Sequence, residues 1–201
     1  MRKLISTAAI LMLIVTLGFA QKMKVISGDF AFLEAQETVV TKLDFSEVTF
    51  YNDNLSEQEY IDKRVKEIEE KDPGESAAWV EDWELFKNER FLEKFTTVAT
   101  ENSKANIQFV TEGNSPYTLI VKATWIYPGW FGGVMKQHAK ISTLLQFVES
   151  GNPDNILLAI EADKAPGDIA FVGIPNNNDR IAEGFAKTGK SLARLIDKEL
   201  K

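Results

Sequence analysis

The sequence predicts an α+β fold with a mainly antiparallel sheet of about five to six strands and two or three packed helices. Three extended runs, 117–126, 140–149 and 156–162, follow one another through turn-rich segments, and strands joined by short turns pair antiparallel most simply. Two longer stretches, 76–100 and 180–200, repeat their apolar residues at helical spacing. No internal repeat or linker divides 21–201, so we expect one domain there.

The run 117–126 is the clearest strand in the chain. Its apolar positions alternate with period two, which predicts one fully apolar face formed by Leu119, Val121, Ala123 and Trp125. Pro128 and Gly129 end the run. The alternating run 140–149 and the run 156–162 follow, so we expect a three-stranded meander.

The amino-terminal half predicts further strands. Residues 24–33 form an extended run that breaks at Gly28, and 38–51 form a longer one. A short run, 106–111, precedes a turn that contains Gly113 and Pro116.

Two helices are expected between these strands. Ser56 and Glu59 have the spacing of a capping box, which predicts a helix that starts there and ends before 72–74. A longer helix covers 76–100, and its apolar face rotates partway along, which suggests two packing partners or a bend. Trp79 and Trp83 on this helix are either a sugar-stacking platform or core residues; the helical spacing favours core.

The carboxyl-terminal part begins with a polar segment, 163–178, which we interpret as a surface loop with a short extended piece at 169–172. Asn178 or Asp179 is expected to cap a final helix, 180–200. Beside its apolar stripe this helix carries a line of small residues that would let it lie close to a sheet, namely Ala182, Ala186, Gly189 and Ala193.

Residues 1–20 have the pattern of a secretory signal peptide. Arg2 and Lys3 precede an apolar core, 4–17, and small residues occupy the two positions before a cleavage site after Ala20. A membrane anchor is the alternative, but the apolar run is short for a span. Cleavage would leave Gln21 as the first residue of a periplasmic or secreted protein without a transmembrane segment.

Composition disfavours several function classes. The formal net charge of −7 becomes −9 when Arg2 and Lys3 are removed, and such an acidic chain is a poor candidate for binding nucleic acid. Without cysteine it has no disulfide, thiol chemistry or cysteine metal site.

Recognisable catalytic chemistry is also missing. His138 is the single histidine, and no nucleophile elbow, zinc motif or phosphate-binding loop is present. A pair of carboxylates acting as a hydrolase has no spacing to support it. The segments 152–155 and 176–179 are either calcium loops or turns, and turns are the usual role of Asn and Asp. We therefore expect a non-enzymatic protein with no cofactor and no metal.

The candidate site is an aromatic segment between the two strongest strands, formed by Tyr127, Trp130 and Phe131. Large apolar side chains in a glycine-rich turn are less easily buried than those in a helix. They form either an exposed patch for a partner or ligand, or a lid on the core.

Several segments resemble a family: SGDFAFL, LDFS, PGESAAW, YTLIVKATWIYPGW, LLQFVESGNPDN and RIAEGFAKTGKSLARLI. They look like uncharacterised exported proteins of the Bacteroidetes, a family without an assigned reaction. The order of elements is more loosely similar to periplasmic domains of the curli-secretion and TolB amino-terminal type. This resemblance implies envelope assembly or partner binding.

Two function hypotheses follow. The first is an envelope protein that acts through protein–protein interaction or self-assembly, which predicts an exposed apolar patch or a free strand edge and no convergent polar pocket. The alternative is a small-molecule or glycan-binding protein that uses Tyr127, Trp130 and Trp125, which predicts a concave site with an aromatic floor.

Overall fold

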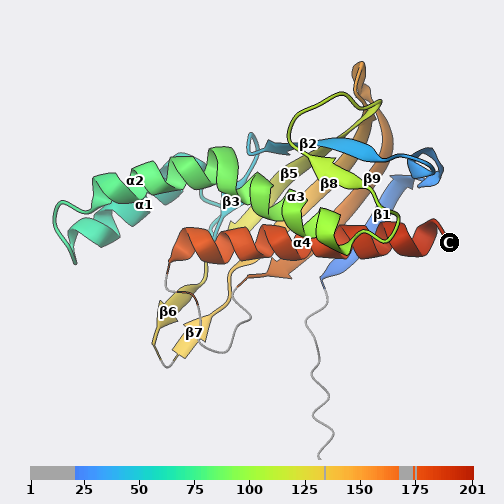
Figure 1. Cartoon of the computed structure of the whole chain (residues 1–201). Helices are drawn as coiled ribbons and strands as arrows, with labels where there is room; N and C mark the ends of the chain where they lie inside the picture. The colour runs from blue at the N-terminus through green and yellow to red at the C-terminus, as the bar shows by residue number, and fades with distance from the viewer. Residues whose placement is uncertain (1–20, 134, 168–173, 175) are drawn as a thin grey trace, which may run out of the picture.

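The computed structural model describes residues 21–133, 135–167, 174 and 176–201 (Figure 1). The predicted signal peptide, 1–20, and the extended piece predicted at 169–172 lie outside these residues. The described residues form an α+β fold, in which helices cover one face of a large sheet (Figure 1).

Within the described residues the large sheet has seven strands and is mixed. Its order is β1 (Lys22–Gly28), β9 (Asn152–Pro166), β8 (Lys140–Glu149), β5 (Tyr117–Tyr127), β2 (Thr38–Asp44) and β4 (Gln108–Val110), and β3 (Thr49–Phe50) also pairs with β5. The predicted meander is confirmed, because β5, β8 and β9 are antiparallel neighbours.

The prediction of a mainly antiparallel sheet is wrong. Strands β2 and β3 run parallel to β5, and β4 runs parallel to β2. Three helices lie between β3 and β4 in the chain, and such a long connection returns the chain to the starting edge, as parallel pairing requires. The length of a connection predicts antiparallel pairing only where that connection is a short turn.

A bulge changes the face that β5 presents near its end. The register against β8 shifts between Ala123 and Trp125, and one extra residue reverses the alternation of side chains. Ile126 is therefore buried in the core with Ala123, whereas Trp125 is only half-buried. The expectation that Trp125 shares the apolar face was wrong because the bulge could not be seen in the sequence.

Helix α1 (Glu57–Glu69) begins with the predicted capping box. The backbone N–H of Glu59 donates to Ser56 Oγ at 3.3 Å, and the backbone N–H of Ser56 donates to Glu59 Oε2 at 2.8 Å. Both bonds satisfy donors that the first turn of a helix otherwise leaves without partners.

The second predicted helix contains a π-helical turn. Helix α2 (Ser76–Leu85) continues through the π-turn η2 (Phe86–Arg90) into α3 (Phe91–Asn102). A π-turn inserts one extra residue into the helix, so Phe91 and Phe95 lie on the same buried face as Trp83. This insertion explains the rotation of the apolar face along the sequence.

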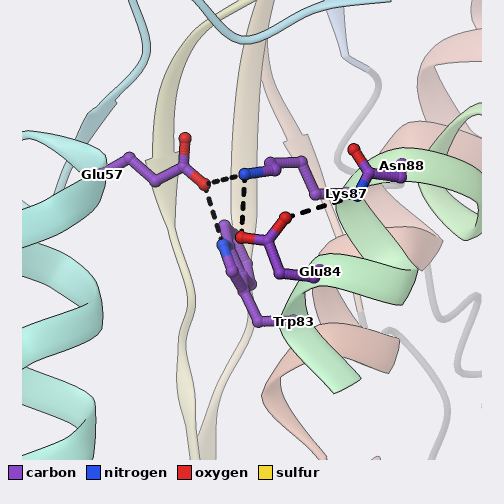
Figure 2. A network of polar contacts seen from close by, with 5 residues as sticks. All are labelled: Glu57, Trp83, Glu84, Lys87 and Asn88. Atoms are coloured by element: carbon purple, nitrogen blue, oxygen red, sulfur yellow. Dashed lines mark hydrogen bonds and ion pairs between the residues drawn. The ribbon is translucent and has the colours of Figure 1, made fainter. Parts of the chain in front are cut away.

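Hydrogen bonds and ion pairs connect this π-turn and the end of α2 to α1 (Figure 2). Glu57 Oε1 accepts hydrogen bonds from Trp83 Nε1 at 2.9 Å and from Lys87 Nζ at 2.8 Å. Lys87 also pairs with Glu84 at 3.0 Å, and Asn88 donates to Glu84 at 3.3 Å. Burial alone would lower the pKa of Lys87, but the two carboxylates raise it above its ordinary value. The lysine thus holds the two helices together as a cation.

Helix α4 (Asn177–Glu199) lies beside α3 on the covered face of the sheet (Figure 1). Its cap is Asn176, whose side chain accepts from the N–H groups of Asn178 and Asp179. The predicted cap at Asn178 or Asp179 was therefore two or three residues too late. A Cβ on Gly189 would lie 2.3 Å from the Phe95 carbonyl oxygen, so this small residue permits close packing of helix on helix.

The remaining elements refine the predictions. The run 24–33 forms β1 and then a 3-10 turn, η1 (Ala31–Leu33), and the run 38–51 is divided into β2 and β3. Trp83 is fully buried and stacks near Trp79 with ring centroids 6.1 Å apart. The core interpretation of Trp83 is thus confirmed.

Candidate functional site

The aromatic segment connects the large sheet to a small hairpin. After Tyr127 ends β5, the chain enters β6 (Trp130–Gly132), which pairs antiparallel with β7 (Met135–Gln137) and stands away from the body (Figure 1). Trp130 is 43% exposed, whereas Tyr127 and Phe131 are half-buried. The predicted partial exposure of Trp130 and Phe131 is confirmed, and their role in binding stays a prediction.

Gln137 holds the polar ends of two of these rings. Its side-chain oxygen accepts from the Tyr127 hydroxyl at 2.7 Å and from Trp130 Nε1 at 3.0 Å. Gly129 has a φ of +67°, and a Cβ there would lie 2.3 Å from the Gln137 backbone oxygen. Only glycine allows this close approach, so the turn fixes the hairpin against the end of β5.

A buried arginine holds the turn at Pro128 and Gly129 in place through hydrogen bonds. Arg180, in the first turn of α4, donates from Nε to the Pro128 carbonyl oxygen at 3.1 Å and from a terminal nitrogen to that of Gly129 at 3.3 Å. It also donates to the Ile174 carbonyl oxygen at 2.7 Å and to the side-chain oxygen of Asn177. The aromatic rings are therefore mounted on a backbone that a helix holds in place.

These rings form one wall of an open cleft with a volume of about 360 Å³. The rest of the lining comes from α1, from Lys71 two residues after its end, from Tyr51 and from the first residue of α4. The cleft is lined by Tyr51, Lys63, Arg64, Glu67, Lys71, Tyr127, Gly129, Trp130, Phe131 and Asn177. We call it the aromatic cleft.

Tyr51 is a wall residue that holds an unusual backbone conformation. Its φ is +58°, which is rare for a bulky residue and is found at constrained functional positions. Its ring meets Tyr127 edge to face with centroids 5.8 Å apart, and Lys63 Nζ lies 4.4 Å from its centroid. Burial, and next the charge of Glu67, raise the pKa of Tyr51 to about 12, so its phenol stays protonated at neutral pH.

A second hollow of about 480 Å³ lies next to the aromatic cleft. Trp125 lines it and stacks with Tyr127, ring centroids 6.4 Å apart and planes inclined by 17°. Its indole N–H donates to the Tyr51 carbonyl oxygen at 2.7 Å. The hollow is lined by Asn52, Asn54, Trp125, Lys140, Ser142, Asp163 and Lys164. We call it the Trp125 hollow.

The sequence-predicted residues are thus brought together, and others join them. Tyr127, Trp130 and Phe131 line one cleft, while Trp125 lines the hollow beside it. Tyr51 and the basic residues of α1 were missed, because the sequence shows no pattern that places α1 against this end of β5. The charged face of α1 was the available signal for a binding site, but such a face is equally typical of a helix surface exposed to solvent.

The other predicted candidates lie at or beside the ends of strands and helices. His138 lies between β7 and β8, the segment 152–155 begins β9, and Asn176 caps α4. No three potential metal ligands gather among the described residues, and the predicted absence of metal and cofactor stays a prediction. In the part of the chain that is described, no helix combines the length and apolar character needed to cross a membrane.

Comparisons with known proteins give distant structural matches. No protein-family model matches the sequence, and a search of curated proteins found no match. Two structures of the PelC dodecamer from Paraburkholderia phytofirmans, one of them a point variant, are each 9% identical and cover 86% of this chain and 96% of their own, with TM-scores of 0.37 for the variant and 0.38. An uncharacterised protein is 10% identical over 89% of this chain and 97% of its own, with a TM-score of 0.33.

Proposed function

We propose that this chain is an exported, non-enzymatic binding protein of the cell envelope that holds a glycan or another small molecule in the aromatic cleft. The observation that carries the proposal is the convergence of Tyr51, Tyr127 and Trp130 on one concave site with polar and charged side chains. Ligand-binding sites usually combine aromatic walls with a few polar groups that orient the ligand.

The way in which the rings are mounted supports binding. Gln137 and Arg180 hold the segment through hydrogen bonds to its side chains and its backbone. A rigid aromatic surface loses little conformational freedom when a ligand binds, so more of the contact energy appears as affinity.

The acids of the cleft support a non-enzymatic role. Among the described residues that line the cleft, Glu67 is the single carboxylate, and it forms an ion pair with Arg64. A glycoside hydrolase needs two carboxyl groups that face one scissile bond. The described lining offers no second acid to act with Glu67.

The proposal is tested by applying purified residues 21–201 to an array of neutral, acidic and amino-sugar oligosaccharides. We expect wild type to bind at least one class, and the double change Trp130→Ala with Phe131→Ala to remove binding while unfolding stability falls by about 1 kcal/mol or less, as for surface positions. The matched control is Met135→Ala, which changes an exposed residue of the same hairpin outside the cleft. Equal binding by the double variant, or no binding by wild type, would contradict the proposal.

A second candidate function, self-assembly, is favoured by one edge of the sheet. Among the described residues β1 is the last strand on its side of the sheet, and it exposes Val25 (39%) and Ile26 (54%). An edge strand with exposed apolar side chains can pair with a second copy. Light scattering of wild type and Ile26→Lys tests this; a monomer at all concentrations in both would rule it out.

Export is part of the proposal. The tripartite pattern of 1–20 predicts that the mature protein begins at Gln21. Mass spectrometry of the periplasmic or secreted protein should give that amino terminus, and an intact Met1 would contradict the prediction.

A further inference from the structure

We infer that the ligand is an acidic oligosaccharide, a chain of sugar rings that bear carboxylate or sulfate groups and extend from the aromatic cleft into the Trp125 hollow. The inference rests on the proposed function of the aromatic cleft. It adds the charge and the length of the ligand, which the aromatic walls alone do not determine.

The charge of the aromatic cleft is opposite to that of the whole chain. The chain has a formal net charge of −7, yet the described residues that line the cleft include Lys63, Arg64 and Lys71 against one acid, Glu67. Arg64 is paired with Glu67, and no ion pair among the described residues engages the two lysines, which are both exposed. Two amines are therefore available for anionic groups of a ligand.

A buried arginine supports the lining of the aromatic cleft from the protein interior. The guanidinium of Arg180 is buried and donates to Gly129 and Asn177, which both line the aromatic cleft. The hydrogen bonds hold this part of the lining in place beside the exposed lysines.

The Trp125 hollow continues the same chemistry. Its described lining contains Lys140 and Lys164 against a single acid, Asp163, and Asp163 accepts a hydrogen bond from Ser142 at 3.0 Å. Lys164 Nζ lies 5.9 Å from the centroid of the Trp125 ring. Cations beside an aromatic face are thus repeated in both sites.

The two sites are joined by a pair of stacked rings. Tyr127 lines the aromatic cleft and Trp125 lines the hollow, and their rings are near-parallel with centroids 6.4 Å apart. A ligand with several rings would therefore reach both sites by following this ring pair. Lysine acts as a point charge without a preferred geometry, so carboxylate and sulfate groups both fit.

Calorimetric titrations of residues 21–201 test the inference. The probes are a hexamer of galacturonate, its neutral methyl ester, a sulfated hexasaccharide and monomeric galacturonate. The variants are Lys63→Gln with Lys71→Gln for the cleft and Lys164→Gln for the hollow. The matched control is Lys198→Gln, far from both sites and highly exposed.

We expect at least one charged hexamer to bind about tenfold or more tightly than the methyl ester, because two or more charge pairs are lost on esterification. The double lysine variant should lose a similar factor for the charged hexamer and none for the ester, and Lys198→Gln should lose nothing. Lys164→Gln should weaken the hexamer and leave the monomer unchanged. Tighter binding of the sulfated chain would assign sulfate as the anionic group, and tighter galacturonate would assign carboxylate.

Binding of both charged hexamers that is no tighter than that of the neutral ester, or binding that the lysine changes leave intact, would overturn the inferred charge. Equal binding of monomer and hexamer would overturn the inferred length. The proposed function fails separately, if Trp130→Ala with Phe131→Ala leaves the binding of the neutral ester unchanged.

Discussion

Replacing Arg180 with methionine should destabilise the protein through the aromatic turn. The change keeps most of the side-chain length and removes the guanidinium, which donates to the backbone oxygens of Pro128, Gly129 and Ile174 at 3.1, 3.3 and 2.7 Å. Each lost hydrogen bond costs about 1 kcal/mol, and more where a carbonyl stays buried without a donor. The sum is roughly 3 kcal/mol, or a fall of about 6–12 °C in Tm for a chain of this size.

Thermal unfolding of residues 21–201, followed by circular dichroism, measures this effect. The matched control is Arg194→Met on the same helix, where the arginine is exposed and the change should stay within about 0.5 kcal/mol. Equal melting temperatures for the Arg180 and Arg194 variants would refute the conclusion that Arg180 holds the turn. Glycan binding by the Arg180 variant should weaken as well, because the rings lose their mounting.

Two further predictions concern the helices. Gly189→Ala should lower Tm by several degrees, because the new Cβ would lie 2.3 Å from the Phe95 carbonyl oxygen and force α3 and α4 apart. The control Gly151→Ala, at a position with open space around it, should leave Tm nearly unchanged. Equal changes in Tm for the two variants would contradict the close packing of α3 and α4. Hydrogen bonds from Ser56, the backbone N–H first, hold the pKa of Glu59 below its ordinary value of 4.5. Because folding lowers the pKa of Glu59, its carboxylate stabilises the folded protein above pH 4.5. This stabilisation is lost as the pH falls through the pKa that Glu59 has in the folded state. The difference in Tm between wild type and Glu59→Ala should therefore shrink in acid, and a difference that is constant with pH would contradict the capping box.

Local signals in the sequence predicted local structure well. The spacing of Ser56 and Glu59 located the start of α1, and period-two alternation located β5 and β8, because these features depend on neighbouring residues. The rotated apolar face of 76–100 suggested two packing partners or a bend, and the structure has the π-turn η2 within this stretch.

Long-range features could not be predicted in this way. The parallel pairing of β2 with β5 depends on where three helices return the chain. The bulge between Ala123 and Trp125 depends on the register against β8. Asn176, the cap of α4, is followed by three polar residues that are equally plausible caps by composition.

The candidate site was predicted in part. Tyr127, Trp130 and Phe131 were identified because large rings in a glycine-rich turn are unusual. Tyr51 was interpreted as the end of a strand, although its ring packs edge to face on Tyr127 and both line the aromatic cleft. Its partners come from α1, which meets this end of the sheet only in the folded protein, so a single sequence offers no evidence of their proximity.

The central claim, that the aromatic cleft binds a glycan, is tested most directly at the Trp130 indole. The protein has four tryptophans, so a ¹H–¹⁵N spectrum should show four indole signals, and the one missing in Trp130→Phe belongs to Trp130. On titration with the galacturonate hexamer or the sulfated hexasaccharide, we predict a saturable shift of the Trp130 signal, while the signal of the buried Trp83 stays in place. A Trp130 signal that does not move at saturating concentrations of either glycan would contradict the claim.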